Sequence, residues 1–274
     1  GNGTTYYELP QSGIQEQMLA LDTTHGNTGL TGLYYFSLSN GSSITENQVI
    51  YGSDVNSILT GGAGNDTLYG STGDDMLNGG AGADTLYGGS GDDLFFVDDD
   101  SNTIVEYANG GNDTVQTTVS YSLALLPTVE NIRLVGSSNS NATGNDSDNL
   151  FISNGGSNSL DGGAGTDTVS FELSQYAVDA SLVSNSASGA GYDTLISIEN
   201  LIGSIYNDTL IGNAGNNVFN GLNGTDTITG FGGNDTIDGG AGSDTIIFSG
   251  NFADYAISFD GTSYTITDST AGRD

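Results

Sequence analysis

The sequence predicts an all-β solenoid, in which short parallel strands stack in successive coils, and two observations carry this prediction. A nine-residue phrase is repeated four times between Gly61 and Phe96, as GGAGNDTLY, GSTGDDMLN, GGAGADTLY and GGSGDDLFF. The phrase returns at 203–247 and, in a weaker form, at 144–170. A fixed period this short is typical of a solenoid, because each repeat is too small to bury a core without its neighbours.

Each phrase divides into a loop and a strand. Positions one to six carry up to three glycines and usually end on an acid, so the backbone there can adopt positive φ angles and turn tightly. Positions seven to nine place one large apolar residue, such as Leu68, Leu86, Ile228, Ile237 or Ile246, between two residues that are often polar. This is the pattern of a very short, half-buried strand. Two phrases therefore predict one coil of about eighteen residues.

Stacking such coils places the sixth-position acids of phrases two apart next to each other. Asp66 is expected over Asp84, and Asp208 over Asp226 and Asp244. Adjacent strands lie only ~4.8 Å apart, so these like charges repel unless a cation lies between them. Carboxylate and backbone carbonyl oxygens together favour Ca²⁺ over Mg²⁺ or Zn²⁺. The sequence therefore predicts calcium sites, each built from two loops.

The candidate calcium ligands are the acids and the glycines of these loops. The acids are Asp66, Asp75, Asp84, Asp93, Asp113, Asp167, Asp193, Asp208, Asp226, Asp235 and Asp244. The glycines are Gly61, Gly62, Gly64, Gly73, Gly79, Gly80, Gly82, Gly88, Gly89, Gly91, Gly162, Gly163, Gly165, Gly191, Gly215, Gly224, Gly233, Gly239, Gly240 and Gly242. Two of the acids, Asp113 and Asp193, lie out of frame, and an ordinary Gly-Asp turn is the alternative for Asp193. Asparagine takes the sixth position at Asn149, Asn158 and Asn217, where sites are expected to be weak or lost.

The repeats resemble the RTX nonapeptide repeats of proteins that Gram-negative bacteria export by type I secretion. The resemblance covers roughly residues 52–274, because the segments between the repeat blocks also look like RTX spacers. It implies a right-handed parallel β-roll, folding that depends on several calcium ions, and secretion as an unfolded chain. A secreted, extracellular or cell-surface location follows from the same resemblance.

The resemblance and the repeat blocks also suggest how the chain divides. Residues 1–51 are expected to form an N-terminal cap or the end of a preceding domain, with two strands around a Ser-Asn-Gly turn. The β-roll is expected at 52–248, and a β-hairpin cap with Asp260-Gly261 at its turn at 249–274. Within the roll, the calcium-binding blocks are predicted at 52–96, 144–170 and 188–247.

Wider coils without calcium are predicted between the blocks. After the first block, the strands at 115–119 and 130–135 are expected to be longer and more apolar, with Pro127 in the turn between them. The acidic run Asp98, Asp99 and Asp100 is interpreted as a solvated loop.

Composition narrows the possible partners. The chain has 34 acids, two basic residues and a formal charge of −32, which excludes binding to nucleic acid. Such a glycine-rich acidic chain is also typical of disorder, which the periodicity opposes for the calcium-bound chain and supports for the calcium-free chain. Cysteine is absent, so no disulfide is expected. No apolar run approaches about eighteen residues, so we expect no transmembrane segment, and the N-terminal GNGTTYYELP suggests a fragment.

The sequence favours a binding module over an enzyme. His25 is the only histidine, which leaves no candidate for a Ser-His-Asp triad or a histidine-rich zinc site. Carboxylate pairs suitable for a glycosidase are abundant, but nothing singles one out. We therefore expect no catalytic activity here, although a parent protein could carry a hydrolase or toxin domain elsewhere.

Two function classes remain open. One is a calcium-responsive folding and export module. The other is an adhesin or surface-layer component that binds a cell-surface partner, or a second copy of itself, through its outward side chains. Thr67 and Tyr69 are expected over Thr85 and Tyr87 on one such face, with Met76, Leu94 and Phe96 on the other. An ice-binding surface would need ranks of Thr-x-Thr, and only Thr227 and Thr229 provide one.

Overall fold

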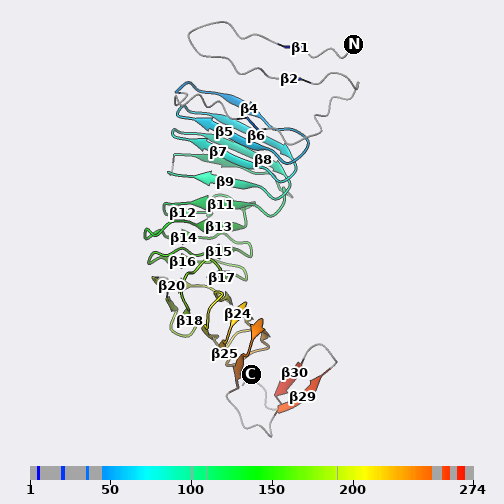
Figure 1. Ribbon diagram of the computed structural model, residues 1–274, viewed down its shortest axis with the longest axis vertical. Coiled ribbons are helices and arrows are strands. Elements are labelled where there is room, and N and C mark those ends of the chain that lie inside the picture. Colours follow the sequence, from blue (N-terminus) through cyan, green and yellow to red (C-terminus); the bar gives the residue numbers. More distant parts are fainter. Residues whose placement is uncertain are drawn as a thin grey trace. The chain divides into compact units, whose positions relative to one another are not determined.

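The structure is a computed structural model that describes residues 45–99, 101–108, 110–189, 191–248, 255–259 and 264–268, together with three two-residue strands nearer the N-terminus. The chain divides into two compact units, Gly1–Val115 and Gln116–Asp274. Within the described residues every regular element is a β-strand (Figure 1). No helix of the described part is long and apolar enough to cross a membrane.

The first unit contains two parallel sheets and a separate antiparallel pair of short strands, β1 (Thr5–Tyr6) and β2 (Ala20–Leu21). Its other strands are β3 (Tyr35–Phe36), β4 (Val49–Tyr51), β5 (Ile58–Gly62), β6 (Thr67–Thr72), β7 (Met76–Gly80), β8 (Thr85–Ser90), β9 (Leu94–Val97) and β10 (Thr103–Val105). One sheet has the order β10-β8-β6-β4, and the other contains β9-β7-β5-β3. Successive strands therefore alternate between the sheets, which confirms that each phrase makes half a coil (Figure 1).

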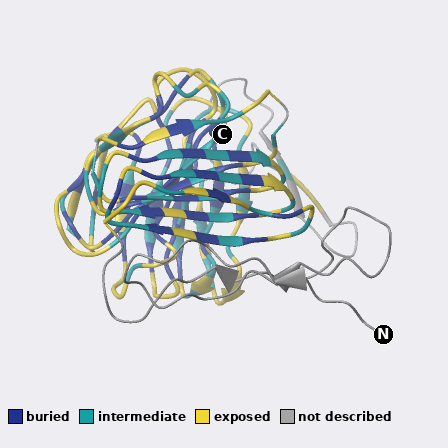
Figure 2. Ribbon diagram, turned by 90° about the horizontal axis from the view of Figure 1, so that it is seen from above, coloured by how far each residue is buried: buried dark blue, intermediate teal, exposed yellow. Residues whose placement is uncertain are grey.

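The period of two phrases fixes the register between strands. Leu68 of β6 pairs with Leu86 of β8, and Leu77 of β7 pairs with Phe95 of β9, each eighteen residues apart. These eighth-position side chains are fully buried, and Figure 2 shows buried residues alternating with less buried ones along the strands. The core is therefore a stack of one large apolar residue per phrase.

Two expectations for the first unit are wrong in detail. The strands β5 to β9 have four to six residues, because the ladder continues into the first positions of the next phrase, as where Ser71 pairs with Gly89. The parallel pairing also begins before residue 52. β4 pairs in parallel with β6, and β3 with β5, so these two strands join the roll rather than standing apart as a cap.

The second unit continues the same design after β11 (Thr114–Thr117), the strand that contains the boundary. Its strands are β12 (Tyr121–Ser122), β13 (Asn131–Leu134), β14 (Ala142–Thr143), β15 (Leu150–Ile152), β16 (Ser159–Asp161), β17 (Thr168–Ser170), β18 (Asp179–Ser181), β19 (Ser186–Ser188), β20 (Tyr192–Ile196), β21 (Asn200–Ile202), β22 (Thr209–Ile211), β23 (Val218–Asn220), β24 (Asn223–Gly224), β25 (Thr227–Thr229), β26 (Thr236–Asp238), β27 (Ala241–Gly242), β28 (Thr245–Ile247), β29 (Tyr255–Phe259) and β30 (Tyr264–Asp268). One sheet contains β26-β23-β21-β17-β15-β13, and the other has the order β12-β14-β16-β20-β19-β18-β22-β25-β28.

An antiparallel insertion interrupts the second of these sheets, which the sequence analysis did not anticipate. β19 pairs antiparallel with both β18 and β20, while β20 and β18 pair in parallel with β16 and β22. The insertion occupies a stretch without the nine-residue period, so nothing there imposes the parallel half-coil path. The third block therefore does not start as a regular repeat at residue 188.

The remaining expectations for the second unit are partly confirmed. Pro127 lies in a turn, and β11 and β13 have four residues each, which is shorter than β5 to β8 of the first block but one residue longer than β15, β16 and β17 of the second. β29 and β30 form the predicted hairpin, whose Asp260-Gly261 turn lies outside the described residues. Ile228 is fully buried as expected, whereas Ile237 and Ile246 are only half-buried.

Candidate calcium centre

Sixth-position carboxylates stack on one another through the backbone. In the first unit, the N–H of Asp66 donates to Oδ1 of Asp84 at 2.7 Å, and the N–H of Asp75 donates to Oδ1 of Asp93 at 2.8 Å. In the second unit, the N–H of Asp208 donates to Asp226 Oδ1 at 2.8 Å. These bonds confirm the predicted stacking. They also orient each accepting carboxylate towards the interior, where its Oδ1 has a hydrogen-bond partner.

The second oxygen of these carboxylates has no partner in the part of the chain that the structure describes. The Oδ2 atoms concerned belong to Asp66, Asp75, Asp84, Asp93, Asp167 and Asp226, each at most 1% exposed. A buried carboxylate oxygen without a hydrogen bond is costly, since water no longer solvates it. A bound cation removes this cost, so these residues fit a metal ion.

Because the first-position residue is glycine, no side chain separates the carboxylate and carbonyl oxygens at these sites. A β-carbon on Gly61 would collide with Oδ2 of Asp66 in the same phrase and with the carbonyl oxygen of Gly79 in the next coil. The same crowding occurs at Gly221, between Asp226 Oδ2 and the carbonyl oxygen of Gly239. Buried carboxylate and carbonyl oxygens are the ligands that Ca²⁺ prefers. The residues therefore fit calcium, which would supply the positive charge between stacked loops.

The other predicted glycines shape the loops. Positive φ angles occur at second and fourth positions, namely Gly62, Gly73, Gly80, Gly82, Gly89, Gly91, Gly163, Gly165, Gly191, Gly224, Gly233, Gly240 and Gly242. Gly82, with φ of 134°, also lies so close to the preceding coil that a β-carbon would collide with the carbonyl oxygen of Gly64. The sequence analysis missed several first-position glycines. These are Gly70, Gly144, Gly203, Gly212, Gly221 and Gly230.

Burial changes the acidity of the inward carboxyls. Desolvation raises the pKa of Asp75, Asp93 and Asp167 to about 6, although backbone N–H donors partly oppose the shift. Desolvation also raises the pKa of Asp84 and Asp226, helped by neighbouring sixth-position acids. The ion-free fold thus disfavours the charged carboxylates that a calcium ion would stabilise.

Two predicted ligands differ from this pattern because protein groups already satisfy both of their oxygens. Asp193 accepts hydrogen bonds from Ser153 Oγ at 2.9 Å and from the N–H of Asn158 at 2.8 Å. Asp208 accepts from the N–H and the hydroxyl of Ser204. Both acids lie in the columns formed by stacked sixth-position side chains. Their surroundings nevertheless fit an ion less well than those of Asp226.

In the coils with asparagine at the sixth position, here called asparagine coils, the side-chain amide donates hydrogen bonds to the surrounding oxygens. Asn149 is 2% exposed, and its Nδ2 donates to the carbonyl oxygen of Glu130 at 2.9 Å and to Oδ1 of Asn145 at 3.2 Å. Asn145 Nδ2 in turn donates to the carbonyl oxygens of Leu126 and Val129, both at 2.8 Å. The amide N–H groups thus satisfy buried oxygens without a cation. This arrangement supports the expectation that asparagine positions lack strong sites.

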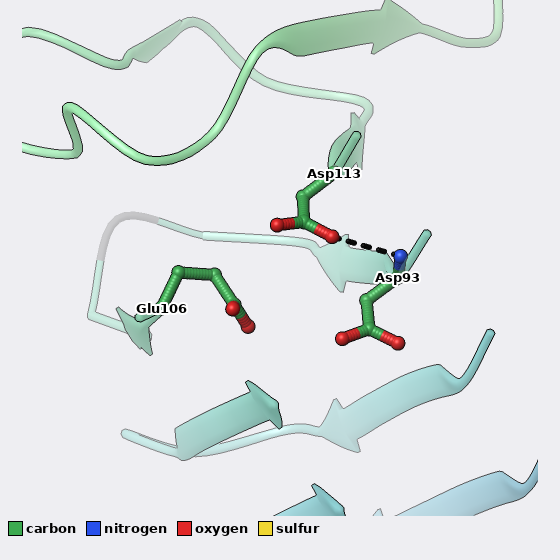
Figure 3. Close-up of side chains that lie close together, drawn as sticks. All are labelled: Asp93, Glu106 and Asp113. Atoms are coloured by element: carbon green, nitrogen blue, oxygen red, sulfur yellow. Dashed lines mark hydrogen bonds between the residues drawn. The ribbon is translucent and has the colours of Figure 1, made fainter. Parts of the chain in front are cut away.

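Two glutamates outside the nonapeptide frame also join the columns. Glu199 accepts the N–H of Asp167 through Oε2 at 2.8 Å, as a sixth-position acid would. Glu106 lies with Asp93 and Asp113 in a cluster of three carboxylates (Figure 3). A signal for Glu199 exists in the sequence, because a Glu-Asn pair precedes an apolar strand at both Glu130 and Glu199.

A second ladder runs along the outside of the loops at the fifth position. Asn65 accepts the N–H of Ala83 through Oδ1 at 3.0 Å, and its own N–H donates to Asn47 Oδ1 at 2.9 Å. The same bond links Asp74 with Asp92, and Asn216 with Asn234. These side chains are exposed and bond to the backbone, so they stabilise stacking rather than bind ions.

The fold and the site together define a parallel β-solenoid protein whose stacked loops fit calcium. A family model for the RTX calcium-binding nonapeptide repeat matches residues 45–77, 69–104, 136–172, 197–228 and 211–246, which is more than half of the chain. The chain therefore belongs to the RTX calcium-binding nonapeptide-repeat family. None of the curated proteins compared with the chain matches it.

Proposed function

We propose that this chain is a calcium-binding module that folds on meeting extracellular Ca²⁺ and thereby supports the export and stability of a secreted bacterial protein. The observation that supports this most strongly is the set of buried, unpartnered Oδ2 atoms on stacked aspartates such as Asp66, Asp84 and Asp226. Ion binding to such residues is part of the folding free energy, because the sites form only when the coils stack. The module itself is proposed to bind rather than to catalyse.

The compartment follows from the affinity expected of such sites. Extracellular calcium modules bind at roughly 10⁻⁴–10⁻³ M, far above the free calcium concentration in the cytosol. With a formal charge of −32 and no ion, the chain is expected to stay expanded while it is made. An expanded chain can pass through a narrow secretion channel, and folding outside would oppose its return.

A calcium titration followed by circular dichroism tests this proposal. The β-sheet signal is expected to appear between about 0.1 and a few millimolar calcium, the range of extracellular modules. The transition is expected to be cooperative, because neighbouring sites share a loop. A full β signal in calcium-free buffer, or a midpoint below 1 µM, would contradict folding outside the cell.

Residue substitutions test where the ions bind. Asp226→Ala is expected to lower the amount of bound calcium, because its carboxylate is buried between those of Asp208 and Asp244. Asp238→Ala is the matched control, since Asp238 is exposed and its carboxylate accepts the N–H of Gly240 within its own loop. Equal losses of bound calcium in calorimetry would show that the assigned register of ligands is wrong.

A second candidate function, adhesion through the roll surface, is favoured by one feature. Tyr51, Tyr69 and Tyr87 stack in register with ring centroids 4.9 and 4.5 Å apart, and Tyr51 is 69% exposed. Exposed aromatic groups of this kind can mark an interface. A surface role predicts that the calcium-loaded chain binds cells or a second copy, and that Tyr51→Ser weakens this binding without changing the dichroism. Unchanged binding in that variant would count against the tyrosines as the interface.

A further inference from the structure

Glu106 occupies a place where other coils have a first-position glycine. β10 pairs with β8 so that Val105 lies opposite Tyr87, and the next residue, Glu106, therefore falls opposite Gly88. At Gly61 and Gly70, the nearest oxygen from the following coil is a backbone carbonyl. At Gly88 it is Oε1 of Glu106 instead. A carboxylate therefore replaces a neutral carbonyl oxygen at this one loop pair.

The Glu106 carboxylate faces two sixth-position aspartates. One carboxylate oxygen each from Asp93, Glu106 and Asp113 lie within 4.8 Å of one another (Figure 3). Oδ2 of Asp93 is buried and has no hydrogen-bond partner among the residues that the structure describes. This atom points into the cluster, because a β-carbon on Gly88 would collide with both Asp93 Oδ2 and Glu106 Oε1.

Backbone N–H groups hold the carboxylates of the cluster in place. Asp113 Oδ1 accepts the N–H of Asp93 at 2.9 Å. The two oxygens of Glu106 accept the N–H groups of Gly89 at 3.2 Å and Tyr107 at 3.3 Å. Gly1–Val115, the unit that contains all three carboxylates, has neither lysine nor arginine in its sequence. Like charges this close favour either protonation or a bound cation.

We propose that Asp93, Glu106 and Asp113 form a three-carboxylate site for Ca²⁺ that binds more tightly than the repeat sites of the first unit and fills before them. This inference rests on the proposed calcium function. Affinity for Ca²⁺ rises with the number of charged ligands, and this site has one carboxylate more than a loop pair with glycine at the first position. Asp93 also accepts the N–H of Asp75, so an ion held at the cluster stabilises the column that the next ions need.

Calorimetric titration of the full chain with CaCl₂ tests the site. The wild type is expected to show one tight site ahead of a weaker group. Glu106→Gln removes one charge at nearly constant shape, so the tight site is expected to weaken by about tenfold or more. Asp54→Asn is the matched control, because Asp54 is an exposed acid of the same unit, and it is expected to leave the titration unchanged.

A second variant keeps the test valid if glutamine disturbs folding. Glu106→Gly restores the residue that other phrases have at this position, so the chain is expected to fold in excess calcium and to lose only the tight site. A tight site that survives in both variants would overturn the inference while leaving calcium-driven folding intact. Loss of every site in both variants would also overturn it, because a single site was assigned. If the wild type bound no calcium, the proposed function itself would fail.

Discussion

Two kinds of coil differ in how their buried oxygen atoms are stabilised. In the coils of Asp66 and Asp84, a carboxylate is buried, and none of the described residues donates a hydrogen bond to its Oδ2. In the coils of Asn149 and Asn158, an amide at the same position donates to the oxygens around it, as where Asn158 Nδ2 bonds to Asn154 Oδ1 at 3.0 Å. The first kind needs a cation to be stable, whereas the second carries its own donors.

The second position of the phrase distinguishes the two kinds of coil. Where the sixth position is an aspartate whose Oδ2 has no partner among the described residues, the second position is not asparagine: it is glycine beside Asp66, serine beside Asp75 and leucine beside Asp226. An asparagine accompanies each sixth-position asparagine, in the pairs Asn145 with Asn149, Asn154 with Asn158, and Asn213 with Asn217. A serine at this position, Ser204, satisfies Asp208. A second-position asparagine therefore accompanies each sixth-position asparagine, and its Oδ1 accepts the amide N–H of Asn149 and of Asn158.

Calcium removal is expected to have the largest effect, and to act unequally. Calcium at about 100 times its Kd stabilises a site by about 2.7 kcal/mol, so its removal is expected to speed amide exchange about 100-fold in β6 and β7. The strands β15 and β16, which flank Asn154 and Asn158, are expected to change much less. Hydrogen exchange by mass spectrometry, with and without calcium, measures both regions in one sample. Equal acceleration in the two regions would show that the amides do not replace the ion.

Conversion of one kind of coil into the other is the next test. Asn213→Gly with Asn217→Asp changes GNAGNNVFN into GGAGNDVFN, which begins as the phrase at Gly61 does. Asn217 Nδ2 donates to the carbonyl oxygen of Glu199 at 2.7 Å, and the variant loses this bond. In calcium-free buffer, we expect a loss of about 1–3 kcal/mol, the usual cost of an unsatisfied buried group.

With calcium, the same variant is expected to recover its stability and to bind one more ion. Thermal unfolding and calorimetry measure the two effects. Asn216→Asp is the matched control, because it adds the same charge at an exposed position and keeps the oxygen that accepts the N–H of Asn234. If the double variant gained no ion, glycine and aspartate at these two positions would not be sufficient for a site.

The nine-residue period was enough to predict most of the fold and the stacking of the sixth-position acids. It places Leu68 opposite Leu86 and Asp66 opposite Asp84, because the register follows directly from a repeat of two phrases. It could not place Glu106 or Glu199. Glu199 stands 32 residues after Asp167, and two extra residues separate Asp93 from Asp113, so the period cannot align them.

Other features depend on side-chain chemistry that the period does not encode. Asp193 fits the loop pattern, yet Ser153 and Asn158 reach its carboxylate from residues 40 and 35 positions away. The antiparallel strand β19 lies in a stretch without repeats, where only tertiary pairing determines the direction of the chain. Such contacts between residues far apart in the sequence cannot be predicted from the repeat period and are seen only in the structure.

Acid is expected to affect the two kinds of coil differently, with a smaller effect than calcium removal. Burial raises the pKa of Asp75 and Asp93 to about 6, and desolvation with repulsion from Asp113 and Asp93 raises that of Glu106 to about 7. Because these folded-state values exceed the ordinary ones, their contribution to stability is present at low pH and is lost as the pH rises through about 6 to 7. The ion-free first unit is therefore expected to be more ordered at pH 5 than at pH 7.5.

Calcium binding is expected to show the opposite trend, since protons compete with the ion for the same carboxylates. The calcium midpoint is expected to rise as the pH falls from 7.5 to 5, while the asparagine coils, which have no ionisable group at the sixth position, keep their exchange protection. Circular dichroism in calcium-free buffer and calcium titrations at both pH values measure these trends. An ion-free first unit that loses order on acidification would show that its buried carboxyls are not the groups that destabilise it.

The outer ladder is expected to contribute least and to act in both kinds of coil alike. Asn65 Oδ1 accepts the N–H of Ala83 at 3.0 Å, and Asn216 Oδ1 accepts that of Asn234 at 2.8 Å, both at exposed positions. A typical hydrogen bond contributes about 0.5–1.5 kcal/mol net, and water can replace an exposed one, so Asn65→Ala is expected to cost about 0.5 kcal/mol. Because these exposed side chains accept backbone N–H groups and are separate from the buried sixth-position carboxylates, the loss is expected to be the same whether or not calcium is present. Thermal unfolding of Asn65→Ala and Asn216→Ala at several calcium concentrations measures this. A calcium-dependent loss in Asn65→Ala alone would mean that the outer ladder and the inner carboxylate column of the first unit act as one network.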